Sequence, residues 1–222
     1  MKLAIVVPVK SPGRAKHRLH NVLNEAERER LATAMAADVF REVRSLEEYG
    51  RFVISDDMGV LRQATDFGLE ALHDRVSQGQ SAAVQQGFAI AWERGYTAAL
   101  TIPGDVPGVT AAELRGLASY RPEIEVLLVT DRERIGTNGL RLVPPHAITL
   151  RFGEDSFNLH RAEAARANRS FAVQEVAGLQ VDLDQPEDIV AFMQLARQTE
   201  TLALLKEMKA AERVLAPTPP RG

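Results

Sequence analysis

Cysteine is absent from this chain of 222 residues. Its absence excludes disulfide scaffolds, zinc–thiolate sites and thiol nucleophiles. No apolar run reaches the length needed to cross a membrane. An excess of one charge is also lacking, because 27 lysines and arginines stand against 30 aspartates and glutamates, a formal net charge of −3. Without a basic surface field, nucleic acid is not an expected partner.

The composition is that of a globular protein. Hydrophobic residues make up 45% of the chain and charged residues 26%, which excludes a disordered or collagen-like chain. The length fits one domain, or one domain with an appendage. The first apolar run, residues 3–9, precedes its neighbouring positive charges, the reverse of the order in a signal peptide. We therefore expect a cytoplasmic protein with no membrane partner.

Short apolar runs alternate with helical patterns along the chain. Strands are expected at residues 3–9, 51–55, 69–73, 97–102, 124–130 and 171–176. Helices are expected after Asn24, which forms a capping pair with Glu27, and also at 61–67, 80–94, from 110, near 156 and from 186. This alternation predicts an α/β fold with right-handed crossovers and a mostly parallel sheet.

The end of the chain has a different character. Residues 199–215 are amphipathic, with an apolar stripe that ends at Leu215. Residues 216–222 are rich in proline, which predicts a frayed tail. The expected organisation is one domain over residues 1–198, followed over 199–222 by a helical extension and a disordered tail. The stripe either covers the domain's own core or pairs with a second copy of the chain.

A basic loop follows the first predicted strand, and open parallel sheets bind ligands at the carboxyl ends of their strands. The loop carries Lys10, Arg14, Lys16 and Arg18 around a Pro-Gly turn. Lysine and arginine both bind phosphate groups, so the loop is suited to a polyphosphate. It lacks the spacing of a Walker P-loop and of a Rossmann glycine fingerprint. The alternative is a solvated basic loop.

Aspartates follow two other apolar segments. Asp105 comes shortly after the 97–102 run, and Asp182 and Asp184 would share one side of an extended segment. Carboxylates at the tips of strands are suited to a hard divalent cation such as Mg²⁺, bridging nucleotide phosphates. Asp105 could instead be a turn residue. Asp184, two residues before a proline, also fits a helix cap.

The remaining candidate residues lie in or next to two polar loops. Thr137 and Asn138 lie between glycines, an arrangement that offers backbone N–H groups and short polar side chains to a ligand. Residues 152–155 lead into a predicted helix, so Ser156 is a predicted N-cap and the helix N-terminus a candidate anion site. His160 lies one turn later on the same face. An ordinary turn and an ordinary cap are the alternatives.

In their order and spacing, these motifs resemble those of the CofC/FbiD family, the guanylyltransferases of coenzyme F-420 biosynthesis. The resemblance runs from residue 2 to about residue 193. It depends on Pro8-Val9-Lys10, Ala15-Lys16, Arg18-Leu19, Gly104-Asp105-Val106-Pro107, Gly136-Thr137-Asn138, Phe152-Gly153, Ser156-Phe157, His160, Asp182-Leu183-Asp184 and Pro186-Glu187-Asp188. It implies a three-layer α/β/α fold, nucleotide-diphospho-sugar-transferase-like (Rossmann-like), around a mostly parallel sheet.

The resemblance implies transfer of GMP from GTP to a phosphorylated three-carbon acid, with release of pyrophosphate. Phosphoenolpyruvate is the first choice of acid, and 2-phospho-L-lactate and 3-phospho-D-glycerate are the alternatives. GTP and the acid are the expected partners, while a homodimer and hand-over of the product to the next enzyme stay open. Competing interpretations are a molybdenum-cofactor or sugar-nucleotide nucleotidyltransferase, a glycosyltransferase, and a non-catalytic nucleotide-binding regulator.

The resemblance also assigns roles to residues of the cation and phosphate sites. It implies that Mg²⁺ is held by Asp105, Asp182 and Asp184. The GTP phosphates would be bound by Lys10, Lys16 and Arg18, and Arg14 is added as the remaining cation of the same loop. Of these residues, the expected catalytic ones are Asp105, Lys10 and Lys16.

The acid would be bound by Thr137, Gly153 and Ser156, with Asn138 and His160 added as candidates from their positions. The chain departs from the family at two places. Gln78-Gly79-Gln80-Ser81 stands where the family usually has a Gly-Leu-Asn-like segment that helps to read the base, so the selectivity for guanine over other bases stays open. Ser81 of this segment is a candidate residue for nucleotide binding. Gly104 stands where an alanine is typical.

Overall fold

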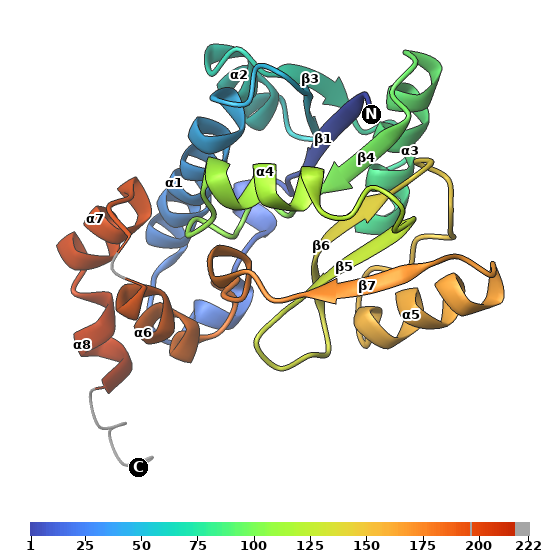
Figure 1. Ribbon diagram of the computed structural model, residues 1–222. Coiled ribbons are helices and arrows are strands. Elements are labelled where there is room, and N and C mark those ends of the chain that lie inside the picture. Colours follow the sequence, from blue (N-terminus) through green and yellow to red (C-terminus); the bar gives the residue numbers. More distant parts are fainter. Residues whose placement is uncertain (196, 216–222) are drawn as a thin grey trace.

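The computed structural model describes residues 1–195 and 197–215. These residues form one sheet of seven strands in the order β3-β2-β1-β4-β6-β5-β7. The strands are β1 (Leu3–Pro8), β2 (Gly50–Ser55), β3 (Glu70–His73), β4 (Ala98–Thr101), β5 (Val126–Thr130), β6 (Thr137–Leu142) and β7 (Phe171–Gln174). Only β6 runs antiparallel to its neighbours among them, which confirms the predicted mostly parallel sheet (Figure 1).

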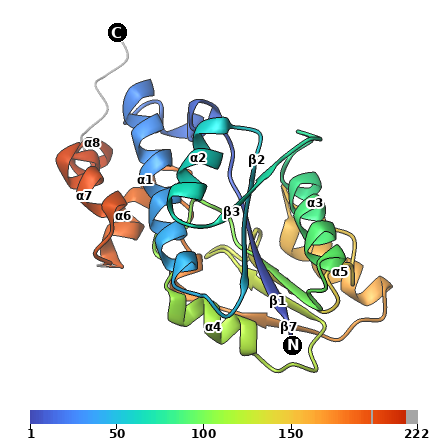
Figure 2. The same ribbon diagram turned by 90° about the horizontal axis from the view of Figure 1, so that it is seen from above.

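Helices cover both faces of the sheet. The helices are α1 (Glu25–Arg44), α2 (Met58–Asp66), α3 (Gln80–Glu93), α4 (Ala111–Ser119), α5 (Ser156–Arg166), α6 (Pro186–Gln194), α7 (Glu200–Glu207) and α8 (Ala210–Leu215). Helices α1, α2 and α4 lie on one face, and α3 and α5 lie on the other (Figure 2). The predicted three-layer α/β/α arrangement is therefore confirmed.

The alternation of side chains along β1 explains the two cores. Ile5 and Val7 pack in the core under α1 and α4, whereas Ala4 and Val6 pack in the core under α3. Because successive residues of a strand point to opposite faces, an unbroken apolar run is what a strand covered on both sides requires. The apolar character of residues 3–7 thus places β1 at the centre of the molecule.

Helix α1 is buried on two sides. It begins at Asn24, which forms the predicted capping box with Glu27: each side chain accepts the other residue's backbone N–H at 2.9 Å. One side packs on the sheet, and the other, including Leu31 and Met35, packs against α6, α7 and α8. The C-terminal helices therefore cover part of the domain's own core (Figure 1).

The C-terminal segment differs from the prediction of one amphipathic stripe. Lys209 has a φ of 52°, which separates α7 from α8. Leu215, predicted on the stripe, is 73% exposed. The division into a domain and an extension remains a prediction, and the predicted tail, residues 216–222, lies outside the described residues.

Strand β6 is the element that the sequence prediction missed, because residues 136–139 were predicted as a loop. The strand contains Asn138, Gly139 and Arg141, residue types that rarely mark a strand. Arg141 is completely buried, and its guanidinium donates hydrogen bonds to backbone carbonyls at and after the C-terminus of α4, among them Leu117 O at 3.1 Å and Ile124 O at 3.0 Å. This tertiary pairing makes the arginine compatible with the core.

Candidate active site

A cleft of about 1060 Å³ opens at the carboxyl edge of the sheet. The carboxyl ends of β1 and β4 lie there, and β6 begins there because it runs in the opposite direction. Eleven of the predicted site residues line this cleft: Lys10, Arg14, Lys16, Arg18, Asp105, Thr137, Asn138, Gly153, Ser156, Asp182 and Asp184. Residues that are widely separated in the sequence thus converge on one space.

Lys16 is a buried charged residue of the cleft. Its side chain is 4% exposed, and its Nζ lies 2.7 Å from Asp105 Oδ2 and 2.6 Å from Asp184 Oδ1. Burial alone would lower the pKa of Lys16, but the two carboxylates outweigh that effect and raise the pKa above its ordinary value. Lys16 is therefore a charged ammonium that joins two of the three predicted metal ligands.

Asp182 is held beside this pair without touching Lys16. Its Oδ1 accepts a hydrogen bond from Asn138 Nδ2 at 3.3 Å, and the same amide donates to Leu179 O at 2.8 Å. Burial, together with the nearby carboxylates of Asp105 and Asp184, raises the pKa of Asp182 to about 6. The three carboxylates are therefore close enough to repel one another.

The loops that carry the carboxylates are tied together by their backbones. Leu183 N donates to Asp105 O at 3.4 Å, which brings the 182–184 segment beside the end of β4. Gly104 lies against β1, because a Cβ at this position would stand 2.7 Å from Val9 Cγ2. The glycine that departs from the family pattern therefore permits a close approach of the Asp105 loop to β1.

Asp184 does not cap the helix that follows it, in contrast to the alternative that the sequence allowed. The N-cap of α6 is Gln185, and Asp188 accepts the backbone N–H of Gln185 at 2.7 Å and of Asp184 at 3.1 Å. Because Asp188 performs the capping, the Asp184 carboxylate faces Lys16. Burial would raise the pKa of Asp184, but the charge of Lys16 lowers it below the ordinary value.

The predicted ligands form no ready-made metal site. Within residues 1–195 and 197–215, no three histidine, cysteine, aspartate or glutamate side chains are arranged to hold a metal ion as they stand. Lys16 Nζ instead lies against Asp105 and Asp184. The donor set still fits a hard cation, because it consists of carboxylate oxygens and a positive charge already lies against two of them.

Thr137 and Ser156 are linked to each other across the base of the cleft. Thr137 N donates to Ser156 Oγ at 2.9 Å. Ser156 is the first residue of α5 and follows the N-cap Asp155, so its prediction as the N-cap was wrong. Since Ser156 Oγ accepts this bond, its own hydroxyl hydrogen is free to serve a ligand.

His160 lies behind this pair and is not among the lining residues of the cleft. It is completely buried, and its Nε2 accepts a hydrogen bond from Arg151 N at 2.9 Å. Burial lowers its pKa to about 4, so the ring is neutral and carries its proton on Nδ1, 3.1 Å from Thr137 Oγ1. His160 thus donates to Thr137, whose hydroxyl hydrogen is left for the cleft.

Ser81 is also not among the lining residues. Its Oγ accepts a hydrogen bond from Phe152 N at 2.8 Å. The next residue, Gly153, has a φ of 126°, a conformation that favours glycine. Ser81 therefore positions the turn that leads to Ser156, and its predicted contact with the nucleotide has no support in these contacts.

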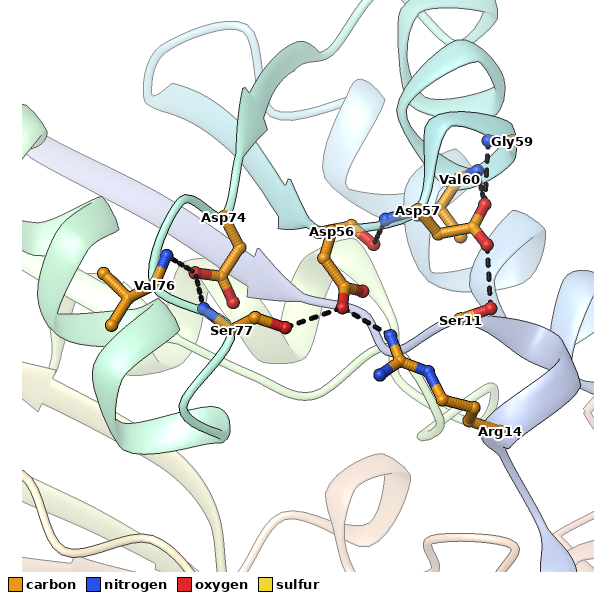
Figure 3. A network of polar contacts seen from close by, with 10 residues as sticks. Ser11, Arg14, Asp56, Asp57, Gly59, Val60, Asp74, Val76 and Ser77 are labelled. Carbon is orange, nitrogen blue, oxygen red and sulfur yellow. Dashed lines mark hydrogen bonds and ion pairs between the residues drawn. The ribbon is translucent and has the colours of Figure 1, made fainter.

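The opposite side of the cleft contains a second polar network, drawn in Figure 3. Arg14 forms an ion pair with Asp56, and Ser77 Oγ donates to the same carboxylate at 2.9 Å. The carboxylate of Asp74 accepts the backbone N–H groups of Val76 and Ser77, each at 3.0 Å. Arg14, predicted to bind GTP phosphates, is thus engaged by an aspartate of the β2–α2 loop.

Sequence reasoning missed three cleft residues that a simple rule would have found. Asp56, Asp74 and Asp131 each come directly after a strand, namely β2, β3 and β5, and all three line the cleft. The rule that ligands bind at the carboxyl ends of parallel strands applies to every strand of the sheet. The residues predicted from the sequence cover only the basic loop and the segments of Asp105 and Asp182 among the strand ends.

Comparison with known proteins adds a family to this geometry. A family model described as "Guanylyl transferase CofC like" matches residues 3–214. The phosphoenolpyruvate guanylyltransferase of Conexibacter woesei is 35% identical over 199 residues, which cover 88% of this chain and 89% of that protein. The 2-phospho-L-lactate guanylyltransferase of Methanocaldococcus infernus is 27% identical, with 83% and 81% covered.

The family match reaches further than the resemblance seen in the sequence. That resemblance ended near residue 193, whereas the match to the family model extends to residue 214 and so includes α7 and most of α8. Among solved structures, one from Desulfovibrio desulfuricans described as a nucleotide-diphospho-sugar transferase superposes with a TM-score of 0.76, at 16% identity, over 96% of this chain and 97% of that one. That similarity supports the fold.

No helix that the structure describes has both the length and the apolar character needed to span a bilayer.

Proposed function

The chain belongs to the CofC-like guanylyl transferase family, and from this premise we propose that it transfers GMP from GTP to a phosphorylated three-carbon acid. The resemblance drawn from the sequence is thereby confirmed at the level of the family, and the protein is a nucleotidyltransferase. Phosphoenolpyruvate is the proposed acid, because the relative at 35% identity is named for it and the one named for 2-phospho-L-lactate is 27% identical. A role in coenzyme F-420 biosynthesis is part of the proposal.

One observation carries the proposal: lysines and arginines, carboxylates and hydroxyl groups line a single cleft of about 1060 Å³. A nucleotide triphosphate and a phosphorylated acid are both anionic and need to be brought together. Holding two reactants side by side removes much of the entropic barrier of a bimolecular reaction. The cleft is lined by groups suited to both substrates.

The basic loop is the proposed triphosphate site. Lys10 and Arg18 are exposed residues of this loop that line the cleft, and Lys16 lies between them. Their positive charges would hold the β- and γ-phosphates, which leave together as pyrophosphate. Cations placed where charge develops in the transition state lower the barrier of phosphoryl and nucleotidyl transfer.

Thr137 and Ser156 are the proposed site of the acid. Each hydroxyl accepts a hydrogen bond from within the protein, as described above, and therefore directs its own hydrogen elsewhere. Two such hydrogens at the start of α5 are suited to the oxygens of a phosphate or carboxylate, because a helix N-terminus favours anions. Gly153, which precedes α5, lets the backbone approach the ligand closely.

Asp105, Asp182 and Asp184 are the proposed ligands of Mg²⁺. When bound, the ion would neutralise charge that builds up on the α-phosphate oxygens. A phosphate oxygen of the acid forms the new bond to the α-phosphorus, and the bond between the α-phosphorus and the bridging oxygen breaks. The attacking oxygen is already an anion, so no general base is required, and the protein acts through alignment and charge stabilisation.

Pyrophosphate release tests this proposal. The protein is incubated with Mg²⁺, one nucleoside triphosphate and one of three acids: phosphoenolpyruvate, 2-phospho-L-lactate or 3-phospho-D-glycerate. We expect release that depends on both GTP and the acid, fastest with phosphoenolpyruvate, and a guanylylated acid as the second product. Release without any acid, or its absence with every pair of substrates, would contradict the proposal.

A further inference from the structure

Lys16 lies where the proposed function, on which this inference rests, requires a metal ion. Its backbone is fixed: the residue has a φ of 60°, and its carbonyl accepts the N–H of Leu19, a buried core residue, at 3.0 Å. The side chain, by contrast, is an unbranched stem with several rotatable bonds. The ammonium can therefore move between positions in the cleft while the loop stays in place.

Lys16 and a divalent cation need the same atoms. Lys16 Nζ lies 2.7 Å from Asp105 Oδ2 and 2.6 Å from Asp184 Oδ1, and both aspartates are among the proposed metal ligands. A metal ion at these oxygens would stand within a few ångströms of the ammonium, where two positive charges repel strongly. The lysine and the metal therefore compete.

We propose that Lys16 is a displaceable internal counter-ion. Before the metal arrives, its ammonium neutralises Asp105 and Asp184. When the metal binds, the ammonium leaves both carboxylates and turns toward the phosphates of the incoming nucleotide.

Two features of the site favour this exchange over a permanent ion pair. The side chains of Asp105 and Asp184 are 33% and 46% exposed, so a hydrated ion can reach them from the cleft. The ammonium, once released, faces a cleft that Lys10 and Arg18 also line, and a triphosphate there gives it an anionic partner. Because the metal has to replace the lysine, it binds weakly alone and more tightly when the nucleotide is present.

Binding of Mn²⁺ without nucleotide tests the competition. The electron paramagnetic resonance signal of free Mn²⁺ is measured for the wild type, Lys16→Met and Lys10→Met. Both variants remove one positive charge from the same cleft, but only Lys16 contacts the carboxylates. We expect Lys16→Met to bind Mn²⁺ about tenfold more tightly than the wild type and Lys10→Met less than about threefold more tightly. An unchanged affinity of Lys16→Met, or an equal gain in both variants, would overturn the proposal.

A measurement on the wild type avoids any dependence on the folding of a variant. The protein is treated briefly with an amine-acylating reagent, with and without Mn²⁺ at a concentration that saturates the site, and modified lysines are mapped by mass spectrometry. Lys16, which is buried and ion-paired, should react slowly without the metal and several-fold faster with it, whereas Lys10 should react at the same rate in both. Equal protection of Lys16 in both conditions would refute the exchange. Neither measurement uses GTP or the acid, so failure of the exchange and failure of the proposed reaction are distinguishable.

Discussion

The two sides of the cleft differ in how their charges are held. At the ends of β1 and β4, Lys16 is buried between Asp105 and Asp184. At the end of β2, Arg14 is 64% exposed and pairs with Asp56. The first side is the Lys16 side and the second the Arg14 side. Both contain a cation of the same basic loop joined to a strand-end carboxylate, yet only one of these cations is withdrawn from solvent.

The difference bears on which side performs the chemistry. A charge held away from water interacts strongly with its partners, whereas an exposed pair is screened by solvent and contributes little. The Lys16 side also adjoins Thr137 and Ser156, the proposed acid site, through Asn138. We therefore propose that the new bond is made on the Lys16 side and that the Arg14 side shapes the cleft.

The largest effect should come from Asp105→Asn. The amide keeps the shape of the side chain but removes a proposed metal ligand and one of the two charges that hold Lys16. Turnover should fall by about a hundredfold to a thousandfold, the range seen when one group that stabilises transition-state charge is lost. Initial rates of pyrophosphate release measure this loss. Asp66→Asn, at an exposed position on α2, is the matched control and should keep full activity.

If Asp105→Asn kept its activity within threefold of the wild type, the proposal that the Lys16 side makes the bond would be contradicted. Melting curves complete the test, because Lys16 still contacts Asp184 in the variant and a folded protein is expected.

A smaller effect is expected from His160→Phe. The substitution removes the donor that directs the Thr137 hydroxyl toward the cleft. The KM for the acid should rise about tenfold, the size expected for loss of one buried hydrogen bond, while the KM for GTP stays near the wild-type value. His160→Asn, which keeps a polar group near Thr137, should recover part of the loss. An equal rise in both KM values would show that His160 supports the fold as a whole and does not position Thr137.

His160 also predicts a pH dependence of stability on the Lys16 side. Its pKa is lowered from 6.5 to about 4 by burial, so the folded protein favours the neutral ring. This preference stabilises the fold fully above pH 6.5, and the stabilisation is lost as the pH falls from 6.5 to 4, because the unfolded chain then gains the proton first. The loss amounts to up to about 3 kcal/mol. Chemical denaturation between pH 7.5 and 4 should show a shallower decline for His160→Phe than for the wild type; parallel curves would contradict the assignment.

The smallest effect should come from Arg14→Ala on the other side of the cleft. Because the guanidinium is exposed and engaged by Asp56, we expect the KM for GTP to rise by less than about threefold. Steady-state kinetics with varied GTP measure it. A rise above about tenfold would return Arg14 to the phosphate site that the sequence predicted.

Much of the fold was predictable because local signals and burial agree. The β-branched run of β1, the capping box at Asn24 and the alternation of strands and helices all predicted the elements that the structure contains. Strand β6 was missed because the buried Arg141 donates hydrogen bonds to carbonyls near the end of α4, and the sequence pattern of β6 alone does not reveal such contacts. The break at Lys209 likewise has no glycine or proline to mark it.

The sequence predicted many of the residues that line the cleft, but it did not predict the contacts between them. The motifs predicted that Asp105, Asp182 and Asp184 lie together, and all three line one cleft. That Lys16 joins two of them, and that Asp188 instead of Asp184 serves the start of α6, follows from the packing of loops distant in sequence. Neither contact has a signature in the spacing of residues.

A crystal structure with Mn²⁺ and GTP would test the central claim most directly, because anomalous scattering locates the metal without ambiguity. We predict one metal peak in contact with Asp105, Asp182 and Asp184, with the Lys16 ammonium withdrawn from both carboxylates and placed against a phosphate. A metal bound elsewhere in the cleft, with the lysine still between Asp105 and Asp184, would contradict the account.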